Sequence, residues 1–293
     1  MHITCSTDDR FVSHCYIMLL SLFENNKREN ITIHILYISL SEMNRKLLSD
    51  LIVDNGSIAH FYAINAQMWK GLPSSDSISM SAYNRLLIPQ LLPANLERVI
   101  YLDCDIIIVG ALTELWDESL DGFSVAAVED VYSLKKETFV RLNYDMSYKY
   151  FNSGVILFNL SFFRNKYLCD RILDIISSLK GHILLHDQDI LNVLCYDTKK
   201  LISNKWNYLE TFCEKEEQPI IIHFAGPVKP WFWGCRNEFT YLYTKYRLES
   251  PWRDDVPTFI KSCKSLKIFF YIAYLLHLEK VYFKIANFVK RLV

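Results

Sequence analysis

The sequence lacks several features that would assign it to a particular class of protein. None of its 8 cysteines belongs to a Cys-x-x-Cys motif, and several lie in apolar segments, so we expect reduced thiols rather than disulfides or structural zinc. A formal net charge of -1 gives no electrostatic signature of nucleic-acid binding. The first residues have neither the basic nor the long apolar region of a secretory signal peptide. These absences favour a cytosolic protein that does not bind nucleic acid.

The chain also lacks an internal repeat and a low-complexity tract, and no linker is evident before about residue 249. Its 293 residues are 51% hydrophobic, which is enough to bury a sizeable core. We therefore expect one large α/β domain over residues 1–250 and an appendage over residues 251–293.

Strand-like and helix-like segments alternate along the first part of the chain. Apolar segments at 3–6, 31–40 and 58–63 have strand character, and the segments at 12–25, from Ser41 onward and at 80–92 have helical spacing or caps. Further strands are expected at 123–128 and 154–159, and further helices at 168–179 and 188–195. Strands separated by helices favour right-handed βαβ units, hence a mainly parallel central sheet with flanking helices.

The segment Val99-Ile-Tyr-Leu-Asp-Cys-Asp-Ile-Ile-Ile108 is the most informative part of the chain. Its apolar start is typical of a central strand that is buried on both faces, and Asp103 and Asp105 follow at the carboxyl end, where open α/β sheets bind ligands. Carboxylates at positions i and i+2 of an extended segment point to the same side and can converge on one divalent cation. The alternative is that the pair caps a turn or a following helix.

A second informative segment contains His223, Gly226 and Lys229. Three isoleucines lead into His223, which predicts a histidine at the end of a strand, although such a residue can also be part of the core or of a turn. An imidazole can complete a metal site that two carboxylates begin, a glycine lets backbone N–H groups approach an anion, and a lysine adds positive charge. The set suits a diphosphate beside a divalent cation, and oxygen ligands with one histidine favour manganese or magnesium over zinc.

Six motifs in this order make residues 1 to 235 resemble the retaining family 8 glycosyltransferases, especially the bacterial lipopolysaccharide galactosyl- and glucosyltransferases. An Asp-x-Asp motif alone is a weak signal, whereas six motifs in register are a strong one. The motifs are Ser6-Thr-Asp-Asp9, Ser81-Ala-Tyr-Asn-Arg85, Tyr101-Leu-Asp-Cys-Asp105, Tyr150-Phe-Asn-Ser-Gly-Val155, His186-Asp-Gln-Asp-Ile-Leu-Asn192 and His223-Phe-Ala-Gly-Pro-Val-Lys-Pro-Trp231.

The resemblance implies a GT-A fold that transfers a hexose, galactose or glucose, from a UDP-hexose donor to a saccharide or lipid-linked saccharide acceptor. It implies Mn²⁺, or alternatively Mg²⁺, held by Asp103, Asp105 and His223. The residues that it places at the reaction centre are Asp187, Gln188 and Lys229. The residues that it places around the donor are Thr7, Asp8, Phe11, Arg85, Asp103, Cys104, Asp105, Asn152, Gly226 and Lys229. Arg10 departs from the small amide common in the family, which puts the ribose contact in question.

Considered singly, several of these residues have simpler interpretations. Arg85 fits a solvated helix face, Asn152 a turn, and Phe11 the core. Asp187-Gln-Asp189 fits the amino terminus of a helix, where carboxylates cap N–H groups and interact favourably with the helix dipole. Retention of configuration is compatible with front-face attack or a covalent intermediate; an amide at Gln188 favours the former, and the carboxylate of Asp187 keeps the latter open.

The appendage has a basic amphipathic pattern. Its longest apolar run, residues 268–276, is shorter than the roughly 20 residues that span a bilayer. The pattern favours peripheral binding to the inner face of the cytoplasmic membrane, where a lipid-linked acceptor would lie, over packing against protein. The polar residues that recur every three or four positions are Lys261, Lys264, Lys267, Tyr271, Tyr274, His277, Lys280, Lys284, Asn287 and Arg291.

Two other functions compete with a glycosyltransferase. An apolar strand that ends in Asp-x-Asp also resembles the nucleophile strand of haloacid-dehalogenase-like phosphatases, although that family has the motif near the amino terminus and would not explain the segment from His223 to Lys229. A non-catalytic sugar-nucleotide-binding protein would use the same binding residues. Release of phosphate from sugar phosphates would select the first alternative, and binding without turnover would select the second.

Overall fold

The computed structural model describes residues 1–73, 80–131, 133, 135–209, 218–226, 228–233, 235–255 and 258–259. The chain divides into two compact units, Met1–Ala225 and Gly226–Val293. The appendage expected over 251–293 falls in the second unit, and the basic pattern of its residues 260–293 lies outside the described residues.

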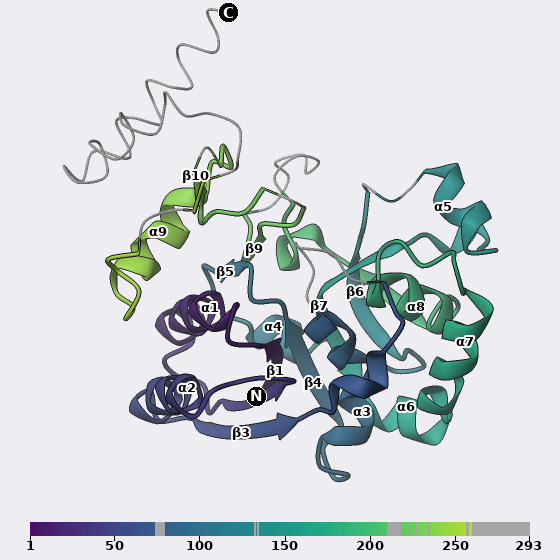
Figure 1. Cartoon of the computed structure of the whole chain (residues 1–293). Coiled ribbons are helices and arrows are strands. Elements are labelled where there is room, and N and C mark those ends of the chain that lie inside the picture. The colour runs from purple at the N-terminus through teal and green to yellow at the C-terminus, as the bar shows by residue number, and fades with distance from the viewer. Residues whose placement is uncertain are drawn as a thin grey trace, which may run out of the picture. The chain divides into compact units, whose positions relative to one another are not determined.

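The first unit is built around a seven-stranded sheet with the strand order β3-β2-β1-β4-β7-β6-β8 (Figure 1). Four of its six pairings are parallel, and the other two join β7 to its antiparallel neighbours β4 and β6. The predicted α/β class with a mainly parallel central sheet is confirmed. The strands are β1 (His2–Thr7), β2 (Thr32–Tyr37), β3 (Ile58–Ala63), β4 (Arg98–Leu102), β6 (Val125–Glu129), β7 (Phe151–Asn159) and β8 (Lys199–Ile202).

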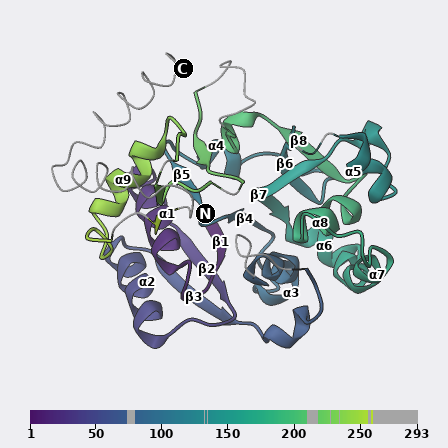
Figure 2. The ribbon, with the colours of Figure 1, turned by 45° about the horizontal axis from the view of Figure 1, so that its top comes forward.

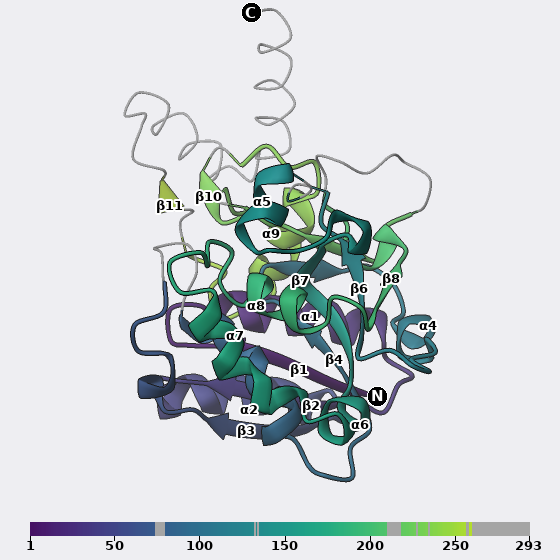
Figure 3. The same cartoon turned by 90° about the vertical axis from the view of Figure 1, so that its right-hand side faces the viewer.

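Helices cover both faces of this sheet. The helices α1 (Val12–Asn25) and α2 (Glu42–Asp54) lie together beside β1–β3 (Figure 2). The thiol of Cys15 on α1 is 3.7 Å from that of Cys5 on β1. Helices α6 (Leu160–Asn165), α7 (Ile172–Ser178) and α8 (Asp187–Leu194) lie at the right in Figure 1 and come to the front in Figure 3. The remaining helical elements of this unit are η1 (Ala66–Trp69), η2 (Met80–Leu87), α3 (Ile88–Leu91), α4 (Thr113–Trp116), α5 (Lys136–Arg141), η3 (Met146–Tyr148), η4 (Leu168–Arg171) and η5 (Asn204–Trp206).

Two helices differ from their sequence-based predictions. Residues 168–179 were expected to form one helix, but the structure has the 3-10 helix η4 followed by α7. Residues 80–92 were expected to form a single helix, but the structure has the 3-10 helix η2 followed by the short α-helix α3. Pro89 explains the break, because it has no N–H group to donate to the carbonyl four residues earlier and is favoured in the first turn of a helix. The tighter η2 holds Tyr83, Asn84 and Arg85 with their side chains buried.

The aspartate pair lies in a turn rather than in an extended strand. Strand β4 ends at Leu102, and the chain turns at Cys104 and Asp105 before β5 (Ile106–Ile108) begins. Strand β5 leaves the main sheet and pairs antiparallel with β9 (Ile221–His223) in a register that puts His223 opposite Ile106. This small second sheet therefore brings a histidine from far along the chain to the end of the Asp-x-Asp turn.

In the second unit, β10 (Phe232–Trp233) pairs in parallel with β11 (Thr258–Phe259), and α9 (Thr240–Leu248) lies between them in the sequence. The guanidinium of Arg247 donates hydrogen bonds to the carbonyls of Arg253 and Asp255, which fixes the chain after α9. No helix among the described residues is both long and apolar enough to cross a membrane.

Candidate active site

Asp103, Asp105 and His223 form one cluster of metal-ligating side chains. One ligand atom from each lies within 4.8 Å of the others, and Nε2 of His223 is 3.3 Å from Oδ1 of Asp105. His223 is buried, whereas the two carboxylates keep partial exposure. Two carboxylate ligands and one imidazole suit manganese or magnesium, so the residues present fit the cation that the sequence suggested.

The imidazole of His223 is held by Asn207, a residue that sequence reasoning missed. Oδ1 of Asn207 lies 2.8 Å from Nδ1 of His223, and Nδ2 of Asn207 donates to Oδ1 of Asn152 at 2.8 Å. An amide oxygen beside Nδ1 keeps the proton on that nitrogen and leaves the lone pair on Nε2, the nitrogen that lies toward Asp105. The backbone assists, because the N–H of Phe224 donates to the carbonyl of Asp105 at 2.9 Å.

Gly154 leaves room for the ring of His223. A Cβ atom at this position would lie 2.3 Å from Cε1 and 2.7 Å from Nδ1 of that ring. We expect Gly154→Ala to displace the imidazole and to weaken Mn²⁺ binding by at least about tenfold, because a misplaced ligand loses coordination. Calorimetric titration with Mn²⁺ measures this, with Gly122→Ala, where a Cβ meets open space, as a control for folding strain. Unchanged Mn²⁺ affinity in Gly154→Ala would remove His223 from the metal site.

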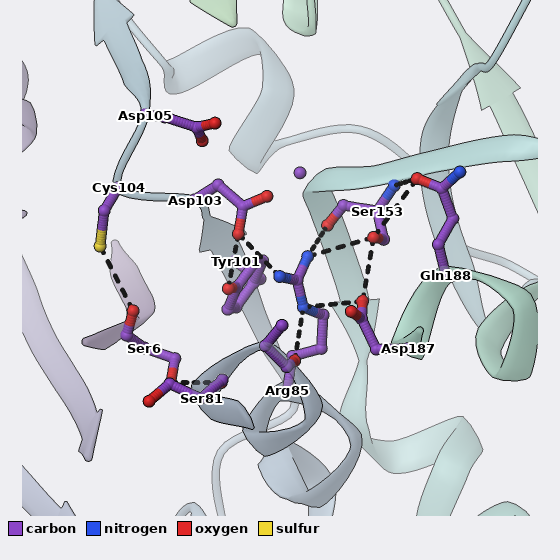
Figure 4. Close-up of polar contacts among 12 residues, drawn as sticks. Ser6, Ser81, Arg85, Tyr101, Asp103, Cys104, Asp105, Ser153, Asp187 and Gln188 are labelled. Carbon is purple, nitrogen blue, oxygen red and sulfur yellow. Dashed lines mark hydrogen bonds and ion pairs between the residues drawn. The ribbon is translucent and has the colours of Figure 1, made fainter. Parts of the chain in front are cut away.

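Arg85 is the centre of a buried network that joins the cluster to α8 (Figure 4). Its Nη2 is 2.8 Å from Oδ1 of Asp103, and its Nε is 3.0 Å from Oδ2 of Asp187. Ser153 accepts hydrogen bonds from Nη1, and the guanidinium stacks on the ring of Tyr101 at 4.3 Å. Arg85 is only 4% exposed, so the interpretation as a solvated helix face is wrong.

Burial and neighbouring charges shift the pKa values of Arg85 and Asp187 in opposite directions. Burial alone would lower the pKa of Arg85, but the carboxylates of Asp103 and Asp187 raise it above its usual value. Burial raises the pKa of Asp187 to about 6, against the opposing effect of Arg85. The guanidinium therefore offsets the negative charge of the two carboxylates in a buried region, where electrostatic interactions are strong.

Gln188 and Asn152 are both fixed by the backbone of β7. Oε1 of Gln188 accepts from the N–H of Ser153 at 3.0 Å, and its Nε2 donates to Oδ2 of Asp130 at 2.8 Å. Asn152 accepts from the N–H of Gly154, so it serves a turn-like role within a strand and also holds Asn207. These contacts bring Asn152, Arg85, Asp187 and Gln188 into the same part of the first unit.

The carboxylates at the start of α8 do not cap it. His186 is the N-cap residue and makes no side-chain cap. Asp189, which is fully buried, accepts two hydrogen bonds from Arg141 and one from the hydroxyl of Tyr150. It also accepts from the N–H groups of Leu184 and Leu185. The cap interpretation is therefore wrong for Asp189, which instead supports the loop before the helix.

The residues expected at the nucleoside lie at the end of β1. Thr7 is buried, and Oδ1 of Asp8 accepts from the N–H groups of Arg10 and Phe11, the residues that immediately precede α1. Phe11 is only partly buried, and its ring meets that of His14 edge-on. The thiol of Cys104 donates to the carbonyl of Ser6 at 3.3 Å, so the Asp-x-Asp turn and β1 are tied together.

Gly226 and Lys229 belong to the second unit. Gly226 has φ of +88°, a left-handed conformation that favours glycine, and the carbonyl of Lys229 accepts from the N–H of Phe232 at 2.9 Å.

Asn207, Ser153 and Tyr101 contribute contacts that sequence reasoning did not assign. Ser153 and Tyr101 fall inside motifs already singled out, and the hydroxyl of Tyr101 donates to Asp103 at 2.8 Å. Their positions within these motifs could have indicated that Ser153 and Tyr101 belong to the site. Asn207 stands in no recognisable pattern, and only the packing of the segment that follows η5 brings it to His223.

Comparisons with known proteins agree with this architecture. A solved structure of the galactosyltransferase LgtC, in complex with donor and acceptor sugar analogs, is similar in fold, with a TM-score of 0.80 at 23% identity over 87% of this chain and 99% of that chain. The likeness of the sheet and its flanking helices to LgtC shows that the first unit has the GT-A fold.

The sequence comparisons identify the family. The model of glycosyl transferase family 8 matches residues 2–234. The chain is 31% identical to a lipopolysaccharide 1,2-glucosyltransferase of Escherichia coli, over 86% of this chain and 79% of that protein. It is 28% identical to general stress protein A of Bacillus subtilis, over 86% of this chain and 94% of that protein. The chain belongs to glycosyl transferase family 8 and is an enzyme, so the phosphatase and the non-catalytic alternatives are set aside.

Proposed function

We propose that this protein is a metal-dependent retaining hexosyltransferase that moves galactose or glucose from a UDP-hexose to a bacterial surface glycan such as lipopolysaccharide. The observation that carries the proposal is the Asp103–Asp105–His223 cluster, which Arg85 connects to Asp187. Relatives named as lipopolysaccharide 1,2-glucosyltransferase and 1,3-galactosyltransferase support the substrate class.

We assign the donor-binding residues by their place in the family motifs and by their surroundings. Thr7, Asp8 and Phe11 bind the nucleoside at the end of β1, beside the turn that contains Cys104. Arg85, Asn152, Asp187 and Gln188 bind the hexose. The ion pair of Arg85 with Asp187, and the contacts that Arg85, Asp187 and Gln188 each make with Ser153, support this grouping. Gly226 and Lys229 bind the diphosphate.

The difficult step is departure of UDP from the anomeric carbon. Asp103, Asp105 and His223 would hold a divalent cation, which would neutralise part of the charge on the diphosphate. Lys229 adds positive charge at the same leaving group, which is electrostatic stabilisation of the transition state. The carboxylate of Asp187 is already paired with Arg85 and accepts from Ser153 at 3.0 Å, and Gln188 is a weak nucleophile. We therefore favour front-face attack, in which the leaving phosphate accepts the proton of the acceptor.

A screen of UDP-sugars for Mn²⁺-dependent hydrolysis tests the proposal without an acceptor. We expect slow release of hexose from UDP-galactose or UDP-glucose and no release with EDTA. Binding of a UDP-sugar without hydrolysis or transfer would contradict the proposed reaction, and hydrolysis that is indifferent to EDTA would contradict the role of the metal.

Lys229→Ala should lower kcat more than it raises the KM for the UDP-sugar, because negative charge on the departing diphosphate grows toward the transition state. Lys229→Arg should restore only part of kcat, since the guanidinium is bulkier and planar. Steady-state hydrolysis of the accepted UDP-sugar measures both parameters. A change confined to KM would mean that Lys229 binds the ground state and the transition state equally.

We propose that the basic segment of the 251–293 tail, from about Phe259 onward, binds the inner face of the cytoplasmic membrane. Replacing Lys261, Lys264 and Lys267 with glutamine should reduce sedimentation with anionic vesicles and leave hydrolysis unchanged, because each lysine near such a surface contributes about 1 kcal/mol. Added salt should weaken binding of the unmodified protein. Equal sedimentation of both proteins would contradict a role for these lysines in binding.

A further inference from the structure

His186, the residue before Asp187, has a buried side chain without hydrogen-bond partners and a strained backbone. It is 6% exposed, and both of its ring nitrogens are buried without a hydrogen-bond partner. No other buried side-chain nitrogen or oxygen is without a partner in the described part of the chain. A buried polar group without a partner is destabilising, and one in a native structure calls for an explanation.

The group next to the His186 ring does not supply a hydrogen bond to its nitrogens. The ring of Tyr83 lies beside it, with centroids 5.9 Å apart. The hydroxyl of Tyr83 already donates to the carbonyl of Pro73 at 2.9 Å. Burial lowers the pKa of His186, partly opposed by Asp189, so the ring is neutral near pH 7 and offers one donor and one acceptor.

The backbone of His186 is also strained. Its φ of 53° and ψ of -126° match the second residue of a type II′ turn, a position that favours glycine. The turn is closed by the N–H of Gln188, which donates to the carbonyl of Leu185 at 3.0 Å. Such conformations persist where neighbouring contacts enforce them, and they concentrate at functional sites. A glycine at position 186 would tolerate the positive φ and would remove the ring without hydrogen-bond partners, yet the chain has histidine there.

We propose that His186 binds hydroxyl groups of a hexose and contributes to sugar specificity, an inference that rests on the function proposed above. A hydroxyl both donates and accepts, so adjacent sugar hydroxyls can satisfy the two ring nitrogens at once. His186 directly precedes Asp187 and Gln188, two of the residues assigned to the hexose, and its ring lies beside Tyr83 of η2, the element that also holds Arg85. The hexose is that of the donor or that of the acceptor, and the two are separable by experiment.

Three variants test this: His186→Gly, His186→Asn, which keeps a donor and an acceptor in a residue that tolerates positive φ, and the control His182→Asn, at an exposed histidine of the same segment. The measurements are the melting temperature, calorimetric binding of UDP-galactose and UDP-glucose, Mn²⁺-dependent hydrolysis, and transfer to free galactose or glucose as acceptor.

We expect His186→Gly to melt at or above the temperature of the unmodified protein and to raise a sugar KM by about tenfold, equivalent to about 1.4 kcal/mol. His186→Asn should recover part of the affinity, and His182→Asn should behave as the unmodified protein. Weaker binding and hydrolysis of the UDP-hexose would assign the donor sugar, whereas a higher acceptor KM with unchanged hydrolysis would assign the acceptor.

Two results would overturn the proposal. Unchanged KM values and binding in His186→Gly would leave the ring with no part in sugar binding. A lower melting temperature, with unchanged KM in the folded fraction, would make His186 a structural residue. Absence of hydrolysis, transfer and UDP-sugar binding in the unmodified protein would instead reject the proposed function itself.

Discussion

Asp105→Asn should reduce metal-dependent turnover by about 10²–10³-fold, because it removes the anionic ligand proposed above, which should contribute several kcal/mol to transition-state stabilisation. The fold should persist, since asparagine has the shape of aspartate and the side chain keeps 14% exposure. Steady-state UDP-sugar hydrolysis over a Mn²⁺ titration measures the loss, and thermal unfolding checks the fold.

Two further variants make this result interpretable. Asp103→Asn should lose activity and also stability, because Asp103 accepts from both Arg85 and Tyr101. Asp50→Asn is the matched control: Asp50 pairs only with Lys46 on the exposed face of α2 among the described contacts, so neither property should change. Normal turnover of Asp105→Asn at saturating UDP-sugar would refute the metal assignment.

Arg85→Ala should destabilise the protein by about 3–5 kcal/mol and abolish activity, because it leaves the carboxylates of Asp103 and Asp187 in the site without their shared cation. Arg85→Lys should recover only part of the stability, since one ammonium cannot reproduce the planar contacts to both carboxylates and Ser153. Denaturant unfolding gives the free energies.

The loss in Arg85→Ala should depend on pH. Burial already raises the pKa of Asp187 to about 6, and removal of Arg85 should raise it further. A carboxyl with a raised pKa in the folded state lowers stability progressively as pH rises from about 4 through the folded pKa. The variant should therefore be closer to the unmodified protein at pH 5 than at pH 8. Equal losses at both pH values would show that Asp187 is not the group left uncompensated.

A double variant separates charge balance from catalysis. Arg85→Gln combined with Asp187→Asn removes one charge of each sign from the network. Because the two side chains are in contact, their effects should not add, and part of the stability lost in Arg85→Gln should return. Activity should not return, since both residues are assigned to the hexose. Strict additivity would contradict the ion pair.

The sequence by itself determined the fold class and the general position of the site. Apolar strand-like segments alternate with helical segments along the chain, and this alternation specifies a mainly parallel sheet. The strands of such a sheet are continuously apolar because both of its faces are buried. The sequence also placed Asp103 and Asp105 at the end of β4. An apolar strand and the polar residues that follow it can both be recognised from neighbouring residues alone. Six motifs in order were enough to indicate the family.

The tertiary structure decided which side chains meet. His223 reaches Asp105 only because β5 leaves the main sheet and pairs with β9, and no local pattern encodes that pairing. Arg85 lies in η2 and is buried, because its guanidinium pairs with Asp103 and Asp187 from segments far along the chain. Asn207 beside His223, and the unsatisfied ring of His186, depend on contacts between distant segments. Local sequence sets backbone preference, whereas partners and burial follow from packing across the whole chain.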